Sequence, residues 1–538
     1  MIEHVFSIYR NNGLKPAIKA VLQDMSAGYL RRKHRAYYEK YSVSMDGEAE
    51  QKDAQYKDEQ YKDVHQRDKQ SKDNPHKDRA AGIIGDYCIV HTERVKLHRA
   101  YRQELLQAVS ESKPALVYTD ELKDGYLLFK PDYAPDNLAA HNYMGNCVAV
   151  RRDMMDKYAW QLAKKDSLWE LNRYICAKCL DGEIMHICRA LYEDLRTEDR
   201  ADYGEMLKEN RTRCADVHRE NRTGAVGTCT EELTGNAETA DTAMSMGMMG
   251  NGTQTAPDTN SQSLLISVII PNCDHAEDLR RCIESLLYVN SYKNIEILIV
   301  ENNSKFEETF AYYNELEKSL PDIIRILHWD GEFNYSAINN YGAAQAKGEL
   351  LLLLNNDTKI IEPDSLKSMA AYAMRDNTGA VGACLLYGDK TIQHAGVIVG
   401  IGPDRTAVHP SQGVPFVERG YRDSIHHVQN YSAVTAACLM VRKLVYDSVG
   451  GLDEKLAVAY NDIDFCLRLK MQGLLNVYVP QALLFHYESK SRGRDDKGEN
   501  HERFVKEVDF FKERWKKLLE AGDPYYNPNL SKEVPWRL

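Results

Sequence analysis

An apolar run that ends in two amides and a carboxylate is the part of this 538-residue sequence best suited to chemistry. Leu350 to Leu354 lead directly into Asn355, Asn356 and Asp357. A buried strand that ends this way places oxygen ligands at the carboxyl edge of a sheet, where open α/β folds bind their ligands. Such oxygens suit Mg²⁺ or Mn²⁺. The motif therefore predicts a metal and phosphate site, and a parallel strand that ends in a plain polar turn is the alternative.

Three further polar clusters follow predicted strands or a turn. They are Asn272-Cys273-Asp274, Glu301-Asn302-Asn303-Ser304 and Asn461-Asp462-Ile463-Asp464. A parallel sheet would gather the first two beside residues 355–357, within reach of a single nucleotide. The sequence has no Gly-rich phosphate loop of the Walker or GxGxxG type, so a metal ion would have to balance the phosphate charge.

Alternating apolar runs and helical patterns must position these clusters. Strands are predicted at 264–270, where Pro271 ends the run, and at 295–300, 323–327 and 350–354. After the first strand, apolar residues recur at helical spacing, with Glu277 and Asp278 in the first turn. Strands separated by helices predict an α/β fold with a mostly parallel sheet.

Several segments, in this order, resemble one known family. They include SVIIPNCDHAEDLRRCIESLL, IEILIVENNS, FNYSAINNYGAAQAKGELLLLLNNDT, TIQHAGVIVG and FHYESKSRG. Together they look like a family 2 glycosyltransferase of the GT-A fold, in the subgroup associated with rhamnosyl transfer and cell-surface polysaccharide synthesis. The resemblance covers essentially all of residues 264–530.

The resemblance implies a binding site for a nucleotide-diphospho-sugar linked to dTDP, UDP or GDP. Family members often carry two aspartates where this chain has Glu301-Asn302-Asn303. Asn340, in an Asn-x-Gly turn, matches a position near the donor, and a helix-surface residue is the alternative. The full set implied for the nucleotide sugar is Pro271, Asn272, Asp274, Glu301, Asn303, Asn340, Asn355 and Asn356.

The resemblance also implies a site for Mn²⁺ or Mg²⁺. Asp357 matches the last aspartate of the family's Asp-x-Asp motif, whose first position is Asn355 here. A neutral amide oxygen predicts a weaker hold on the ion than a carboxylate would give. His486 matches a histidine that can complete the coordination, and a hydrogen-bonded core histidine is the alternative.

Asp462 is the expected general base. Inverting transfer needs a carboxylate on the sugar face opposite the leaving nucleotide, and Asn461-Asp462 keeps the aspartate of the family's Glu-Asp motif. Asp464 is assigned structural support. Lys490, Arg492 and Arg494 could close over the leaving diphosphate, and a solvated basic run is the equal alternative.

The rest of the chain divides by composition. Residues 1–45 are expected to be helical, and 46–80 carry a charged repeat of five residues that matches neither helix nor strand. Residues 196–263 are a low-complexity linker, and 264–538 form the catalytic domain. Residues 81–195 resemble the second half of the same fold, truncated and degenerate, with His91-Thr92-Glu93 in place of the aspartates.

A group of metal-ligand residue types lies in this first segment. Cys176, Cys179, His186 and Cys188 have a spacing that a zinc site could use. Apolar residues interleave with them as core positions would, so packing is the favoured interpretation and zinc stays open.

Composition limits the partners. The net charge of −11 argues against nucleic acid. The sequence shows no apolar run near the length of a membrane span, which favours a cytoplasmic protein with peripheral contact at the inner membrane face. Apolar residues at helical spacing from Phe504 to Leu519 are expected to pack in a core. An oligomer is compatible with the sequence.

The function expected from the sequence is inverting, metal-dependent transfer of a sugar, rhamnose among the candidates, to a growing surface polysaccharide or lipid-linked glycan. A non-catalytic glycan-binding or scaffold protein with a relict transferase fold is the main alternative. A nucleotidyltransferase is disfavoured because its phosphate loop is missing.

Overall fold

A computed structural model describes residues 79–195 apart from positions 93, 163, 164, 166 and 181, together with residues 264–487 and 498–536. The regions assigned to an N-terminal helical region (1–45), a charged insert (46–80, apart from its last two residues) and a linker (196–263) lie outside the described residues. The loop with Lys490, Arg492 and Arg494 also lies outside them.

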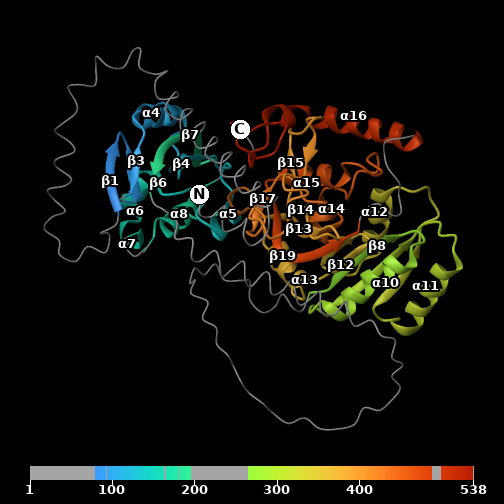
Figure 1. The fold of residues 1–538 in the computed structure, drawn as a ribbon. Coiled ribbons are helices and arrows are strands. Elements are labelled where there is room, and N and C mark those ends of the chain that lie inside the picture. The colour runs from blue at the N-terminus through green and yellow to red at the C-terminus, as the bar shows by residue number, and fades with distance from the viewer. Residues whose placement is uncertain are drawn as a thin grey trace, which may run out of the picture. The chain divides into compact units, whose positions relative to one another are not determined.

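The first half of the C-terminal segment builds a parallel sheet (Figure 1). Its strands are β8 (Ile266–Asn272), β9 (Ile295–Glu301), β10 (Ile324–His328) and β11 (Leu350–Leu354), in the spatial order β10-β9-β8-β11. All four are close to the ranges predicted from their apolar runs. Their carboxyl ends meet at one edge, which brings the predicted polar clusters together.

The second half of the segment continues the same sheet with mixed pairing. β18 (Cys438–Arg442) is antiparallel to both β11 and β13 (Thr378–Leu386), and β19 (Leu475–His486) is parallel to β13. β12 (Thr358–Ile360) closes the order as an antiparallel neighbour of β19. The short strands β14 (Ile392–His394) and β17 (Gln429–Tyr431) pair with β13 and β19. The predicted α/β class, with a parallel sheet in its first half, is confirmed for this segment.

Helices cover both faces of this sheet (Figure 1). Successive strand residues point to opposite faces, and both faces are apolar. One core packs against α10 (Ala276–Glu284), α11 (Glu307–Ser319) and α13 (Ser365–Ala373). The other packs against α12 (Tyr335–Gln345), α14 (Lys443–Ser448), α15 (Asn461–Met471) and α16 (Gly498–Ala521). Phe511 and Trp515 of α16 are buried in this second core, as their helical spacing predicted. No helix among the described residues is long and apolar enough to cross a membrane.

Pro271 does not end β8, which runs on to Asn272. The pairing of β8 with β11 stops at Ile269, while Pro271 stands opposite Val300 of β9. Proline lacks a backbone N–H, so it is tolerated where a ladder on one side has already ended.

The first segment forms a separate seven-stranded sheet in which six strands follow the order β1-β2-β6-β4-β7-β3 and β5 pairs with β4. Its elements are β1 (Arg79–Ile84), β2 (Tyr87–Thr92), β3 (Val95–Leu97), α4 (Tyr101–Ser112), β4 (Leu116–Lys123), β5 (Tyr126–Leu128), α5 (Pro135–Ala140), β6 (Cys147–Arg151), α6 (Arg152–Lys157), α7 (Ala159–Leu162), α8 (Leu168–Cys176) and β7 (Ile184–Asp194). β6 is antiparallel to β2 and β4, and β7 is parallel to β4 and antiparallel to β3. Strands β11, β18, β13, β19 and β12 have the same relations in the same chain order.

The strand registers of the two sheets change which residue of the first segment corresponds to Asp357. Arg94 directly precedes β3, as Asp357 directly precedes β12. Val95 pairs with Asp194, and Thr358 pairs with His486. Arg94, rather than a residue from 91–93, therefore takes the place of the predicted metal ligand, and Asp194 takes the place of the histidine. That this segment is a degenerate transferase domain stays a prediction.

Buried polar contacts join the first segment to the second. Asp136, in the first turn of α5, forms a two-pronged ion pair with Arg375 at 2.5 and 3.0 Å. Asn430 donates to Asp136 Oδ2 at 2.6 Å, and its backbone N–H donates to Asn137 Oδ1 at 2.6 Å. Removal of one partner of such a buried pair would leave a charge unpaired, so these contacts are costly to break.

Candidate active site

A cavity of about 930 Å³ opens at the carboxyl edge of the parallel strands. Its volume is in the range of sites that hold nucleotide-sized ligands. Nine of the residues predicted for the site line it: Pro271, Asn272, Asp274, Asn303, Asn355, Asn356, Asp357, Asp462 and His486. The edge of the sheet gathers these side chains although they are spread over more than 200 residues of sequence.

The predicted metal ligands lie side by side. Antiparallel pairing of β12 with β19 sets Thr358 opposite His486, so His486 Nε2 approaches Asp357 Oδ1 to 3.1 Å. Asn355 Nδ2 lies 3.2 Å from the same nitrogen. Burial opposes the charge of Asp357, yet the contact with His486 keeps the pKa of this carboxyl below its usual value. An ionised carboxylate and an imidazole nitrogen thus face one point in the cavity.

These residues fit a divalent ion. Asp357 Oδ1 is buried, and apart from its contact with His486 Nε2 at 3.1 Å no described residue donates a hydrogen bond to it. His486 Nδ1 lies 2.8 Å from Gln393 Oε1, so it can donate to the amide oxygen while Nε2 is directed at Asp357. A buried carboxylate oxygen beside an oriented imidazole is an arrangement that a bound cation would complete.

Two loops that are held by hydrogen bonds form the other end of the cavity. Asp274 Oδ1 accepts the backbone N–H groups of Lys305 and Phe306 at 2.8 and 3.0 Å. Asp274 and Asn303 both have positive φ, at 55° and 60°. Asn303 Nδ2 donates to Gly331 O at 2.9 Å. The hydrogen bonds hold these left-handed turns, which shape the wall predicted to contact the base and ribose.

Asn272 and Asn356 connect this wall to the metal end. Asn356 Nδ2 donates to Asn272 Oδ1 at 2.6 Å, and Asn272 Nδ2 lies 2.6 Å from the Tyr313 hydroxyl. Burial raises the pKa of Tyr313, so the hydroxyl keeps its proton. The two asparagines are therefore held in place before any ligand binds.

Two predicted donor contacts lie outside the cavity lining. Glu301 is buried and accepts hydrogen bonds from Ser304 N, Ser304 Oγ and the Tyr313 hydroxyl, each at 2.6 Å. The Asn340 side chain donates to the backbone oxygen of Leu452 and accepts the backbone N–H of Leu452. It also accepts a hydrogen bond from the Tyr446 hydroxyl at 2.6 Å. Both side chains stabilise loops in this structure, and a contact with the donor stays a prediction for each.

Asp462 also lines the cavity and lies in the first turn of α15. Its Oδ2 accepts the backbone N–H of Ala436 at 3.0 Å, and its Oδ1 accepts that of Ile463 at 2.8 Å. The Tyr335 hydroxyl lies 3.0 Å from Ala436 O and 3.1 Å from Asn355 Oδ1. The Tyr335 hydroxyl can donate to either oxygen, so it lies between the backbone that holds the predicted base and one of the predicted metal ligands.

Helix α16 supports the base from behind. Glu507 accepts the backbone N–H groups of Val458 and Ala459 at 3.2 and 2.7 Å, just before α15 begins. Burial raises the pKa of Glu507. One turn earlier, Arg503 lines the cavity and lies 3.8 Å from Glu507 Oε1. Arg503 therefore brings a guanidinium to a cavity whose predicted ligand is a diphosphate.

Asp464 has the structural role predicted for it. It is fully buried and contacts Arg468 Nε at 2.7 Å, Arg514 Nη1 at 2.8 Å and Trp515 Nε1 at 2.9 Å. These bonds tie α15 to α16. The buried carboxylate is neutralised by two guanidinium groups, as a stable buried charge requires.

Sequence reasoning missed four cavity residues that the fold brings in. Gln393 orients His486, Tyr335 links the two ends, Arg503 supplies charge, and Phe306 is 59% exposed at the cavity wall. Gln393 and Tyr335 lie inside the segments TIQHAGVIVG and FNYSAINNYG that carry the resemblance, which was the available signal. The other two carry no local signal in a single sequence.

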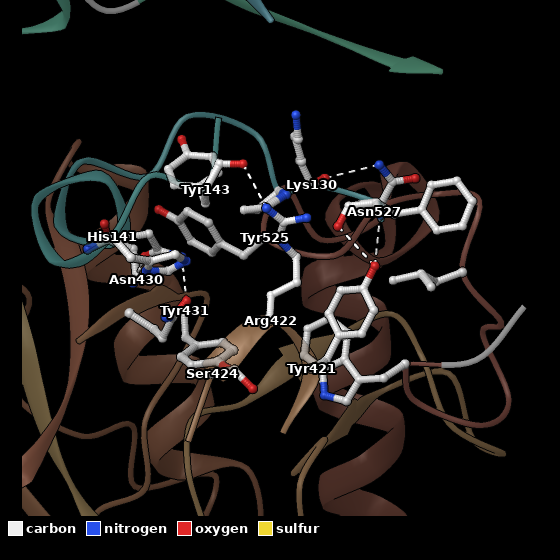
Figure 2. Close-up of a pocket in the computed structure, with 16 residues that line it drawn as sticks. Lys130, His141, Tyr143, Tyr421, Arg422, Ser424, Asn430, Tyr431, Tyr525 and Asn527 are labelled. Carbon is white, nitrogen blue, oxygen red and sulfur yellow. Dashed lines mark hydrogen bonds between the residues drawn. The ribbon is translucent and has the colours of Figure 1, made fainter. Parts of the chain in front are cut away.

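A second cavity, of about 30 Å³, lies where residues 129–143 meet residues 421–431 and 525–536 (Figure 2). Arg422 extends into its centre and donates from Nη2 to Tyr143 O at 2.9 Å. Lys130, also in the lining, has its ammonium 3.2 Å from Glu121. Since one water needs about 10–15 Å³ of such space, this cavity holds solvent rather than a substrate.

The cysteine-rich group of the first segment separates into two parts. Cys176 is buried in an apolar core, and the Cys179 thiol donates to Ile175 O at 3.2 Å. His186 and Cys188 lie together instead with Asp132, and their ligand atoms fall within 4.8 Å of one another. The four residues named from the sequence therefore do not form one cluster.

Comparison with known proteins shows what the second segment is similar to. The profile described as Glycosyl transferase family 2 matches residues 267–409. An uncharacterised protein of Sinorhizobium fredii is 45% identical over half of this chain, which covers 29% of that protein. The O-antigen biosynthesis protein RfbC of Myxococcus xanthus is 33% identical over 80% of this chain, which covers 32% of it. A dTDP-rhamnosyl transferase of Shigella flexneri is 22% identical over 42% of this chain and 69% of its own length. The chain thus spans about a third of the first two relatives.

Proposed function

Because residues 267–409 match the profile of glycosyl transferase family 2, we propose that this chain transfers a sugar from a nucleotide-diphosphate donor to a growing surface glycan. The observation that carries the proposal is the buried Asp357 carboxylate, 3.1 Å from His486 Nε2, in a cavity of nucleotide size. The likeness to an O-antigen biosynthesis protein and to a dTDP-rhamnosyl transferase supports a polysaccharide acceptor and makes dTDP-rhamnose the first donor to test.

Asp357 and His486, with Asn355 beside them, would hold Mn²⁺ or Mg²⁺. When bound, the ion would neutralise the charge that develops on the leaving diphosphate. Arg503 would add a guanidinium to the same diphosphate, and the hydrogen-bonded loops at Asp274 and Asn303 would receive the nucleoside.

Asp462 would act as the general base of an inverting reaction. Its carboxylate, fixed by Ala436 N–H, would accept the proton of the acceptor hydroxyl while that oxygen attacks the anomeric carbon. The bond from the anomeric carbon to the diphosphate oxygen breaks as the new glycosidic bond forms. A location in the cytoplasm, with the acceptor presented at the inner membrane face, remains part of this proposal.

Thermal stabilisation of the purified chain by dTDP-rhamnose and by UDP- and GDP-sugars, each with and without Mn²⁺, tests the donor site. A ligand at a hundred times its dissociation constant adds about 2.7 kcal/mol to the free energy of unfolding. A metal-dependent shift with one donor that disappears in Asp357→Ala supports the proposal. A folded protein that no donor stabilises would favour the alternative, a glycan-binding scaffold.

A further inference from the structure

We propose that Asp132, His186 and Cys188, in the first segment, form a binding site for a divalent transition-metal ion, Zn²⁺ first among them. One ligand atom from each side chain lies within 4.8 Å of the others. This site is built from residues that the proposed transfer reaction does not use, and it is separate from the cavity at Asp357.

The distances around His186 match the edges of a tetrahedral site. His186 Nδ1 lies 3.2 Å from Asp132 Oδ1 and 3.6 Å from Cys188 Sγ. With usual zinc bond lengths, tetrahedral geometry places nitrogen and oxygen ligands about 3.3 Å apart and nitrogen and sulfur ligands about 3.6 Å apart. Two of the three distances thus match, and the third, between Asp132 and Cys188, is at most 4.8 Å, so the exposed Asp132 side chain would move to complete the site.

The far side of the imidazole has the partner that metal-bound histidines require. His186 Nε2 lies 3.0 Å from Asp120 Oδ1, and the Asp120 side chain is fully buried. A carboxylate in this position accepts the Nε2 proton and leaves the Nδ1 lone pair for the metal. The Tyr118 ring stacks on His186 at 4.7 Å between centroids, which fixes the plane of the imidazole.

The supporting carboxylate is itself held by two segments of the chain. Asp120 Oδ1 accepts Lys130 N–H at 2.8 Å, and Asn527 Nδ2 lies 3.1 Å from both Asp120 oxygens. Figure 2 shows Asn527 beside Lys130, where its Nδ2 also donates to Lys130 O at 3.0 Å. A network that orients the outer partner of a ligand is typical of metal sites.

Backbone contacts position the remaining two ligands. His186 and Cys188 are two apart on β7, and Cys188 Sγ lies 3.6 Å from His186 Nδ1. The register between β4 and β7 shifts directly after Ile187, which turns Cys188 out of the regular ladder. Asn529 Nδ2 donates to Cys188 O at 2.7 Å, and Asp132 N donates to Pro524 O at 2.8 Å.

The chemistry of the donors selects the ion. A thiolate, an imidazole and one carboxylate suit Zn²⁺ and its neighbours, whereas Mg²⁺ and Mn²⁺ prefer oxygen ligands. Three protein ligands leave a fourth position, and the Asp132 side chain is 55% exposed, so solvent can supply it. A bound ion would join β7, the 129–132 loop and the 523–530 segment.

Co²⁺ binding to the full chain, without a polyhistidine tag and in an Asp357→Ala background, tests the site. Co²⁺ adopts zinc sites and gives a charge-transfer absorption when a thiolate coordinates it. We expect one equivalent of Co²⁺ to produce this absorption and Zn²⁺ to displace it. Asp357→Ala removes the predicted cavity metal, which has no sulfur ligand.

Matched variants locate the sulfur. Cys188→Ser should abolish the absorption, and Asp132→Asn should keep it while weakening the affinity by about tenfold or more. Cys179→Ser should leave the absorption and the Co²⁺ affinity unchanged, and so should the double change Cys214→Ser with Cys229→Ser. The proposal fails if the folded chain shows no thiolate absorption with Co²⁺, or if the absorption survives in Cys188→Ser.

Discussion

His486 Nε2 lies 3.1 Å from Asp357 Oδ1 because β12 and β19 pair with Thr358 opposite His486. In the first segment, the equivalent pairing of β3 with β7 sets Asp194 opposite Val95, the residue that follows Arg94. A cation and a carboxylate thus replace the carboxylate and imidazole of the second segment. Arg94 would repel a divalent ion, so we expect donor binding at the second segment alone.

Replacement of Gln393 tests how His486 is oriented. In Gln393→Leu the ring loses its acceptor at Nδ1, and metal affinity should fall by about tenfold or more. Gln412→Leu is the matched control, because Gln412 lines the same cavity but donates to the Tyr387 hydroxyl. Titration of Mn²⁺ against each variant measures the effect. Equal affinities in the two variants would show that Gln393 does not orient a metal ligand.

Asp462→Asn separates chemistry from binding. The amide oxygen can still accept Ala436 N–H, so the fold and the donor-induced stabilisation should persist. Loss of the general base should lower the rate of sugar transfer by about 10²–10⁴. Single-turnover transfer from the donor found by thermal stabilisation measures the rate. A variant that retains near-normal transfer would remove Asp462 from the mechanism.

Arg503→Gln tests the contact with the diphosphate. Loss of a charged hydrogen bond costs about 1.5–3 kcal/mol, so KM for the donor should rise about tenfold or more. Lys506→Gln, at an exposed position on the same helix, should leave KM unchanged. Competition by the free nucleoside diphosphate should weaken in parallel in the arginine variant only. If both variants bind the diphosphate alike, Arg503 does not contact the diphosphate, and its role is limited to the ion pair with Glu507.

Asp464 is predicted to be a stability residue. Asp464→Ala leaves Arg468 and Arg514 without their buried partner and should lower the free energy of unfolding by about 3–5 kcal/mol. Urea unfolding compared with Asp509→Ala, an exposed carboxylate on α16, isolates the buried contribution. A loss below about 1 kcal/mol would mean that the tie between α15 and α16 is dispensable.

Glu121 should make the protein sensitive to acid. Burial opposes its charge, but Lys130 and Arg422 outweigh burial and lower the pKa of Glu121 from 4.5 to about 2. A lowered folded-state pKa contributes stability that is fully present above pH 4.5 and is lost as the pH falls toward 2, by about 3 kcal/mol.

Urea unfolding of the native chain and Glu121→Gln between pH 6 and pH 3 measures this contribution. The stability difference between the two should be largest at pH 6 and should shrink on acidification. Glu317→Gln, at an exposed site, should run parallel to the native chain. A difference that stays constant with pH would show that Glu121 titrates alike in folded and unfolded chains.

The strands that carry the donor site were predictable because each is a continuous apolar run that ends in polar residues. β11 matches its predicted range, and β9 differs by one residue. Asp357, His486 and Asp462 were found through motif resemblance, and all three line the cavity. Gln393 and Arg503 were not found, because their roles depend on neighbours far away in the sequence.

The sequence by itself determined the α/β class, the order of elements and the residue types at the carboxyl ends of the strands, since these follow from local periodicity and turn chemistry. Only the tertiary structure decided which side chains meet. Strand register set His486 against Asp357, and long-range contacts took Glu301 and Asn340 out of the cavity. The same folding removed Cys176 and Cys179 from His186 and brought Asp132 to it, because proximity across a sheet depends on pairing rather than on spacing along the chain.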